Sequence, residues 1–194
     1  MTATIVRTET LSDGHYRLDR LHLAQRCRDG TNQEITREVL RQPAACAVLP
    51  RDPGRGTVLL VRQLRAPVLL AGGAGLLIEA AAGIIEDGDA PEDTVRKEAE
   101  QELGYRLHAL RELFNLFPSP GASSERIHLF LAEYAASART GCGGGLPTEG
   151  EDIEVLELPL AEAVAMARRG EIIDMKTVLL LHAALLDPVS GPVA

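Results

Sequence analysis

The order of strand-like and helix-like patterns along the chain limits the folds that it can adopt. Polar and apolar residues alternate in three stretches between residue 3 and about residue 40, and the turn sequences SDGH and RDGTN separate them. Two more apolar stretches, ACAVLP and TVLLVRQL, flank the turn RDPGRG. We expect the hairpin that they form to be more deeply buried than the first three strands, because it contains fewer polar residues.

The clearest helix is predicted over residues 90–103. Asp89 can cap its first turn and Gly104 can end it. The residues that recur every four positions, and so form its buried face, are Val95, Ala99 and Leu103. This amphipathic pattern indicates that one face of the helix packs on a sheet.

The rest of the chain continues to mix the two kinds of element. Strands are predicted within residues 70–89, 107–117, 126–135 and 153–159, and helices over 160–170 and 175–186. A parallel sheet would require a regular strand–helix–strand alternation, which this order lacks. The sequence therefore favours an α+β fold with a mixed sheet.

The composition fits one globular domain, or one domain with a small extension: 194 residues, 45% hydrophobic and 25% charged. The net charge of −8 argues against a nucleic-acid partner, which usually requires a basic stripe. Cys27, Cys46 and Cys142 are odd in number and far apart, which indicates a reducing compartment rather than disulfides or a zinc site. The N-terminus does not resemble a signal peptide, and no apolar run approaches the roughly 20 residues of a membrane span. We expect a cytoplasmic protein that does not contact a membrane.

Glu98 and Glu102 lie one turn apart on the predicted helix, with Cβ atoms about 5–6 Å apart. Like charges at this spacing repel, so their pairing calls for a compensating charge. A hard cation such as Mg²⁺ binds carboxylate oxygens and fills the rest of its shell with water and phosphate oxygens. The alternative interpretation is a solvated acidic face, which is common on helices rich in glutamate.

The surrounding residues resemble the Nudix box. Gly83 is followed after five residues by Asp89, and after seven more by a run that ends at Gly104 and Tyr105. Every spacing of the box is kept, and three residues depart from it: Asp89 for Glu, Lys97 for Arg, and Gln101 for the first of the paired Glu. Asp89 keeps a carboxylate, Lys97 keeps a charge without the bidentate fork, and Gln101 removes a charge. The resemblance implies a Nudix fold, a mixed sheet between helices, and a hydrolase.

The resemblance extends beyond the box. The segments VRQLR, IEAAAG and SPGASSE are similar to the ADP-ribose pyrophosphatase group, and ERIHLFLAEY and GEIIDMKTVLLL are most similar to GDP-mannose pyrophosphatases within it. The likeness runs from about residue 6 to residue 186. It implies a Nudix domain over 43–194 and an N-terminal antiparallel β extension over 1–42. The implied reaction is Mg²⁺-dependent hydrolysis of the nucleotide sugar GDP-mannose to GMP and mannose 1-phosphate.

Matching positions give the site residues that the resemblance implies. Glu98, Glu102 and the backbone carbonyl of Ala82 would bind Mg²⁺ or Mn²⁺. Glu151 would approach the metal, and either Glu151 or a carboxylate of the box would act as general base. The substrate-binding residues would be His15, Arg37, Glu38, Arg65, Glu125 and Lys176. His15 stands where the family usually has an aromatic residue that stacks on the base, so the neighbouring Tyr16 is an alternative for that role.

In the family the N-terminal strands pair with a second subunit, so the resemblance also implies a homodimer. These strands could instead pack on their own domain. Two other functions stay open: hydrolysis of ADP-ribose to AMP and ribose 5-phosphate, and nucleotide binding without turnover. Base contacts separate the two substrates, and one sequence does not reveal them.

Overall fold

The computed structural model describes residues 1–187, so the last residues of the predicted domain over 43–194 lie outside the described part. The chain forms two compact units. The first consists of residues 1–44 and 117–126, and the second of residues 45–116 and the chain from residue 127 onward. Each unit is described by itself below.

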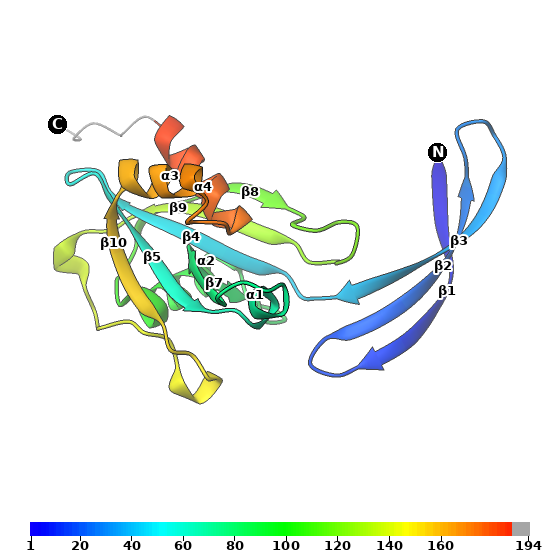
Figure 1. Cartoon of the computed structure of the whole chain (residues 1–194), viewed down its shortest axis with the longest axis horizontal. Coiled ribbons are helices and arrows are strands. Elements are labelled where there is room, and N and C mark those ends of the chain that lie inside the picture. Colours follow the sequence, from blue (N-terminus) through cyan, green and yellow to red (C-terminus); the bar gives the residue numbers. More distant parts are fainter. Residues whose placement is uncertain (188–194) are drawn as a thin grey trace. The chain divides into compact units, whose positions relative to one another are not determined.

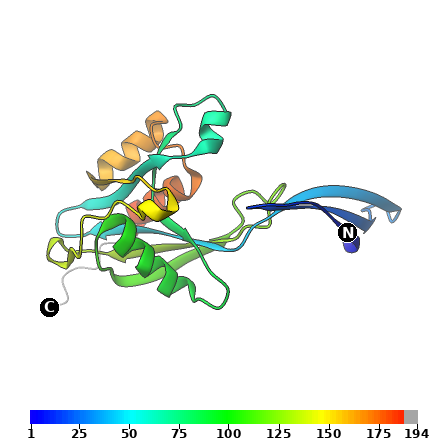
Figure 2. The same cartoon turned by 90° about the horizontal axis from the view of Figure 1, so that it is seen from below.

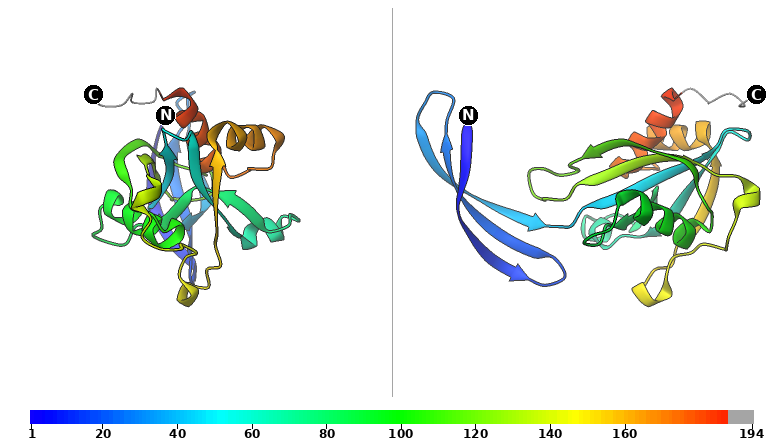
Figure 3. Two further views of the ribbon diagram at one scale, coloured as in Figure 1. Left: turned by 90° about the vertical axis from the view of Figure 1, so that its left-hand side faces the viewer. Right: turned by 180° about the vertical axis from the view of Figure 1, so that it is seen from behind.

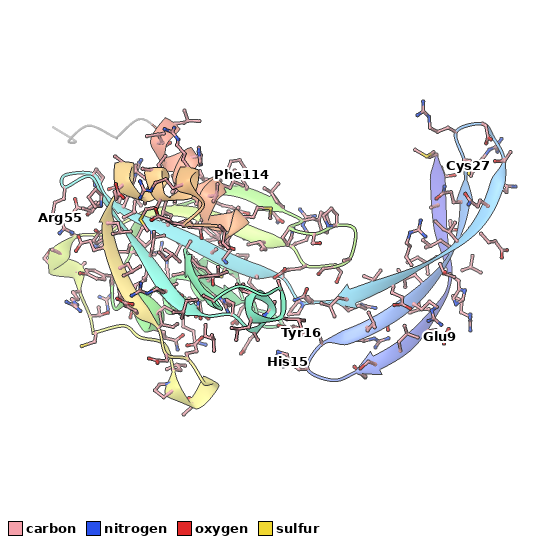
Figure 4. The ribbon with its side chains drawn as sticks, in the orientation of Figure 1. Glu9, His15, Tyr16, Cys27, Arg55 and Phe114 are labelled. Atoms are coloured by element: carbon pink, nitrogen blue, oxygen red, sulfur yellow. The ribbon has the colours of Figure 1, made fainter. Side chains whose placement is uncertain are left out.

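The first unit is built on a three-stranded antiparallel sheet in the order β1-β2-β3. The alternating pattern predicts two or three strands in this part of the chain, and the structure has three: β1 (Thr2–Asp13), β2 (Arg17–Arg26) and β3 (Asn32–Arg41). Figure 4 labels His15 and Tyr16 in the turn between β1 and β2, and Cys27 at the end of β2.

The segment 117–126, which belongs to the loop between two later strands, also packs in the first unit. The backbone amide of Leu40 donates to the carbonyl of Ala122 at 2.8 Å, and the amide of Ser124 donates to the carbonyl of Leu40 at 3.0 Å. This loop therefore continues the hydrogen bonding of β3 at its C-terminal end.

The second unit contains a seven-stranded mixed sheet with the main order β10-β5-β4-β9-β8, in which β6 pairs with β5 and β7 with β4. β4 and β9 run parallel and the other pairs are antiparallel. The strands are β4 (Ala45–Asp52), β5 (Thr57–Leu64), β6 (Leu76–Glu79), β7 (Ala81–Ile84), β8 (His108–Leu116), β9 (Ile127–Glu133) and β10 (Glu154–Pro159). The helices are α1 (Ala66–Leu70), α2 (Pro91–Glu98), a π-helical turn η1 (Ala99–Leu103), two short 3₁₀ turns at Ala136–Ala138 and Pro147–Glu149, α3 (Leu160–Arg169) and α4 (Met175–Leu186). The short helix α1 is not predicted by the sequence pattern.

Helices cover both faces of this sheet. α3 and α4 lie on one face, and α2 lies on the other (Figures 1 and 3). Successive residues of β4 alternate between the two cores: Cys46 and Val48 face α2, whereas Ala47 and Leu49 face α3 and α4. The hairpin of β4 and β5 is therefore buried on both sides, as its apolar composition predicts, and the expected α+β fold is confirmed.

The central helix differs from its prediction at the start. Ala90, in an extended conformation, is the N-cap, and no side chain caps the first turn. The predicted cap at Asp89 is wrong by one residue, because Pro91 opens the helix and the amide of Asp89 instead donates to the carbonyl of Glu86 at 3.0 Å. The predicted end at Gly104 is confirmed by its left-handed φ of 76°. Figure 2 shows this helix from its outer side. None of the helices within residues 1–187 is long and apolar enough to cross a membrane.

Candidate active site

Glu98 and Glu102 lie at the end of the central helix, beside strand β7. The carboxylate of Glu102 is 1% exposed and accepts a hydrogen bond from the backbone amide of Ala82 at 3.1 Å. Glu98 is half-buried, and its side chain packs directly on Gly83. A Cβ atom at Gly83 would lie 2.2 Å from Glu98 Oε1, so any larger residue there would displace the Glu98 side chain.

The helix changes from α to π geometry between the two glutamates. The π turn spans Ala99–Leu103 and so contains Glu102 but not Glu98. Such turns alter the direction in which side chains leave the helix, and they occur often at functional sites. Gly104 closes the turn, and its amide donates to the carbonyl of Glu100 at 3.2 Å.

Burial dominates the electrostatics of Glu102. Removal from water raises the pKa of its carboxyl to about 8, and the negative charges of Glu98 and Glu151 act in the same direction. The hydrogen bond from Ala82 and the charge of Arg65 oppose this shift. Without a cation, Glu102 therefore holds a proton through much of the neutral range.

These groups fit a hard divalent cation. In an extended strand the N–H and C=O of one residue point to the same side, so the carbonyl of Ala82 lies on the side of β7 from which its amide donates to Glu102. Within residues 1–187 no three acidic, histidine or cysteine side chains form a ready cage for a metal ion. Two carboxylates and one carbonyl leave the other positions for water and phosphate oxygens, as Mg²⁺ prefers.

Glu151 lies in the loop that precedes β10. Its carboxylate accepts a hydrogen bond from the amide of Leu146 at 2.8 Å, and its charge contributes to the raised pKa of Glu102. The structure thus brings Glu151 near enough to Glu102 for its charge to act there, although more than 45 residues separate the two in sequence.

The glycine-rich loop before Glu151 is hydrogen-bonded to the end of the helix. The amides of Gly144 and Gly145 donate to the carbonyls of Glu102 and Gln101 at 2.9 and 3.2 Å. Gly143 makes this crossing possible, because a Cβ atom there would lie 2.4 Å from the carbonyl oxygen of Glu102. The loop, predicted only as a flexible segment, therefore satisfies carbonyl groups that the helix end leaves free.

Arg65 and Lys176 meet on a carboxylate that sequence analysis did not identify. Glu79 is 2% exposed; Arg65 Nε and Nη2 donate to its two oxygens at 2.8 and 3.2 Å, and Lys176 Nζ donates at 2.6 Å. Burial alone would raise the pKa of Glu79, but the two cations outweigh it and lower the pKa below its ordinary value. A glutamate within the apolar segment LLIEAAAG was the available signal.

Lys176 is fixed further by the start of α4. Its Nζ lies 3.0 Å from Oδ1 of Asp174, which caps this helix by accepting from the amide of Thr177 at 2.9 Å. The hydroxyl of Thr177 accepts from the amide of Ala80 at 2.7 Å, beside Glu79. α4 and β6 are therefore joined at this corner of the site.

The second unit brings together six of the predicted site residues, and the other four belong to the first unit. The six are Ala82, Glu98, Glu102, Glu151, Arg65 and Lys176, and the four are His15, Arg37, Glu38 and Glu125.

Within the first unit, His15 packs edge-to-face on Tyr16 with ring centroids 4.5 Å apart. Glu38 accepts from Arg20 across the β2–β3 pair at 2.9 Å, and Arg37 donates to the carbonyl of Thr36 at 2.7 Å. Figure 4 shows His15 and Tyr16 together in the turn.

A mixed sheet between helices, with a half-buried and a buried glutamate on the helix that follows the strand of Gly83, is the arrangement of a Nudix-type hydrolase. The NUDIX domain model matches residues 40–179, and the model of the GDP-mannose pyrophosphatase NudK N-terminal domain matches residues 2–40. The chain therefore belongs to the Nudix family of hydrolases.

Relatives match nearly the whole chain. A GDP-mannose pyrophosphatase of Escherichia coli O1:K1 / APEC is 43% identical over 180 residues, which cover 92% of this chain and 93% of the relative. One from Salmonella arizonae is 43% identical over 189 residues, covering 97% of each chain. A crystal structure of an ADP compounds hydrolase covers 95% of this chain and 93% of its own, with a TM-score of 0.73. Its identity of 17% makes it a likeness of fold alone.

Proposed function

We propose that this protein is a Mg²⁺-dependent nucleotide-sugar pyrophosphatase that hydrolyses GDP-mannose to GMP and mannose 1-phosphate. The observation that carries the proposal is the 43% identity to GDP-mannose pyrophosphatases over 92% of the chain, in both units. The intact glutamate pair supports turnover rather than binding alone, because Glu98 and Glu102 keep their carboxylates despite the departures at Asp89, Lys97 and Gln101.

The metal would be held by Glu98, Glu102 and the carbonyl of Ala82. A bound Mg²⁺ supplies charge neutralisation for the diphosphate and lowers the pKa of water. Glu151 takes the proton of the attacking water as general base. The water oxygen bonds to one phosphorus, the bridging P–O bond breaks, and the bridging oxygen leaves with the other phosphate.

The remaining side chains bind and orient the substrate. Arg65 and Lys176 are held by Glu79 on the same face of the second unit as Glu102, so their N–H groups are fixed before substrate arrives. The residues of the first unit that would contact base and sugar are His15 or Tyr16, Arg37, Glu38 and Glu125.

We also propose that the protein is a homodimer through its N-terminal strands. Of the first unit, all of whose residues are described, only Asp19 is buried. Ile5 and Val6 of β1 are 61% and 67% exposed. A three-stranded sheet with so little buried area is marginal by itself, and a second copy would cover it.

A cytoplasmic location agrees with the cysteines. Cys27, Cys46 and Cys142 are all free thiols, and Cys142 is exposed. A reducing compartment keeps such thiols from oxidising.

The decisive experiment is phosphate release through a coupled phosphatase, with GDP-mannose and ADP-ribose in parallel, in Mg²⁺ and in EDTA. We expect turnover of GDP-mannose that requires Mg²⁺. Preference for ADP-ribose would keep the mechanism and change the substrate. Binding of GDP-mannose without turnover of either compound would contradict the enzymatic proposal.

A further inference from the structure

One buried amide in the second unit has no hydrogen-bonding partner. Gln63 lies on β5 and is 7% exposed, and its Nε2 atom has no acceptor among residues 1–187. The only other buried side-chain atom in this condition within those residues is the hydroxyl of Thr94. A buried donor that gives up water without gaining a partner destabilises the fold, so such groups call for an explanation.

The position of Gln63 supplies that explanation. Residues of β5 alternate between faces, and Gln63 shares the face of Leu59 and Val61, which pack in the core beneath the central helix. Two residues further along the same face is Arg65, whose charge acts on Glu102. Along this face of the strand, Gln63 therefore lies between the core residues Leu59 and Val61 and the cation Arg65.

The charged side chains beside Gln63 on this face of the sheet bind one another. Val61 pairs with Glu79 across β5 and β6, which makes Gln63 a diagonal neighbour of Glu79 on the same face. Both oxygens of Glu79 accept from Arg65, and one also accepts from Lys176. The amide of Gln63 takes no part in this network.

We propose that Gln63 is a further substrate-binding residue, whose Nε2 donates a hydrogen bond to an oxygen of the bound nucleotide sugar. The inference rests on the proposed function and adds a contact to the same site. A neutral donor that is unpaired before binding gains its only hydrogen bond in the complex, so it favours ligands that place an acceptor oxygen there.

The test is the variant Gln63→Met, which keeps an unbranched side chain of similar size and removes the amide. We expect the melting temperature of the ligand-free protein to stay level or rise, because an unpaired buried donor is gone. We expect KM for GDP-mannose to rise at least fivefold. Thermal protection by GMP and by mannose 1-phosphate, measured separately, identifies the half of the substrate that Gln63 contacts, and loss with either product supports the proposal.

The matched control is Thr94→Val, which removes the other unpaired buried group from α2 while keeping its shape. Its KM should be that of the wild type. A Gln63→Met variant that loses stability while its KM and its protection by both products stay unchanged would assign Gln63 a structural role and overturn the proposal.

A second measurement covers the case in which Gln63→Met does not fold. The side-chain amide resonances of Gln63 in ¹⁵N-labelled wild-type protein should move when GMP or mannose 1-phosphate is added, and no shift with either would overturn the proposal. Wild-type protein that neither binds nor hydrolyses GDP-mannose would overturn the proposed function and this inference together. An active wild type with an unaffected Gln63 overturns this inference alone.

Discussion

Glu102 is fully buried, and we propose that its carboxylate binds a cation. Its amide partner Ala82 fixes one oxygen, and Gly83 lets Glu98 approach from the other side. Without metal, the proton on Glu102 removes the charge repulsion between Glu98 and Glu102, and we propose that a bound cation replaces that proton.

Replacing Glu102 by Gln should lower kcat for GDP-mannose by at least about 10³-fold while the fold is kept, since the variant loses a metal-binding charge. Steady-state kinetics and circular dichroism measure the two effects. Glu100→Gln is the control, because Glu100 is exposed on the same helix and pairs only with Arg106 on the surface. Near-wild-type activity of Glu102→Gln would contradict the metal assignment.

The raised pKa of Glu102 also predicts how stability depends on pH. Its ordinary pKa is 4.5 and its folded pKa is about 8, so between these values the folded protein holds a proton that the unfolded chain has lost. Without metal, stability contributed by this group falls as pH rises through that window and levels off above it.

Urea unfolding in EDTA should therefore show Glu102→Gln to be more stable than the wild type. The difference in unfolding free energy should grow from about 1 kcal/mol at pH 5 to as much as about 4 kcal/mol at pH 8. Added Mg²⁺ should stabilise the wild type and not the variant. A difference independent of pH would show that Glu102 is ionised in both states.

The ion pairs of buried Glu79 should contribute more to stability than the exposed ion pair of Glu154. Glu79→Ala leaves Arg65 and Lys176 without their shared carboxylate, so we expect a loss of about 3 kcal/mol in unfolding free energy and a raised KM. Glu154→Ala, which removes the exposed partner of Arg62, should cost less than about 1 kcal/mol. Equal costs, measured by urea titration, would contradict this account of the site.

Among the contacts between secondary-structure elements, the one between the π turn and the glycine-rich loop bears most directly on the positions of Glu102 and Glu151. The loop closes the end of the helix that carries Glu102 and, six residues after Gly145, provides Glu151. Backbone hydrogen bonds thus hold the segments that carry Glu102 and Glu151 next to each other, although they are distant in sequence. These bonds do not depend on side-chain rotamers.

Gly143→Ala should disturb the contact between the glycine-rich loop and the π turn. A side chain at this position would be strained at the φ of 69° and would clash with the carbonyl of Glu102. We therefore expect the unfolding free energy to fall by about 2–3 kcal/mol and kcat to be about tenfold lower. Gly170→Ala is the control, with a φ of 76° and open space around its Cβ position. It should cost about 1 kcal/mol and leave kcat unchanged. Equal effects of Gly143→Ala and Gly170→Ala on kcat would rule out a role for the contact between the loop and the π turn.

At the scale of the whole molecule, the two units differ in how they are stabilised. The second has cores on both faces of its sheet, whereas the first buries only Asp19, with Arg17 at 2.9 Å and Arg41 at 3.4 Å. The exposed apolar side chains of β1 are the feature that a second copy would cover.

The double variant Ile5→Asp/Val6→Asp should shift the protein from dimer to monomer in sedimentation velocity, because it places charges on the strand that we expect to be covered. Thr8→Asp, an exposed polar position on the same strand, is the control. A wild-type monomer at micromolar concentration would contradict the proposed dimer.

The sequence by itself determined what depends on near neighbours. The alternating strands of the N-terminal sheet, the stripe of Val95, Ala99 and Leu103, and the paired glutamates all follow from short repeats, because side chains a fixed number of residues apart share a face. The predicted cap at Asp89 was wrong by one residue, because the sequence pattern locates the first residue of a helix only to within one or two positions.

Only the tertiary structure decided the contacts between distant segments. Lys176 reaches Glu79 across 97 positions, and Gly144 binds the end of a helix about 40 positions earlier. The unpaired amide of Gln63 likewise emerges only when its surroundings are known. Local sequence patterns determine on which face of a helix or strand a residue lies. The folding of the whole chain determines which faces pack together, and the partners of a buried charge depend on that packing.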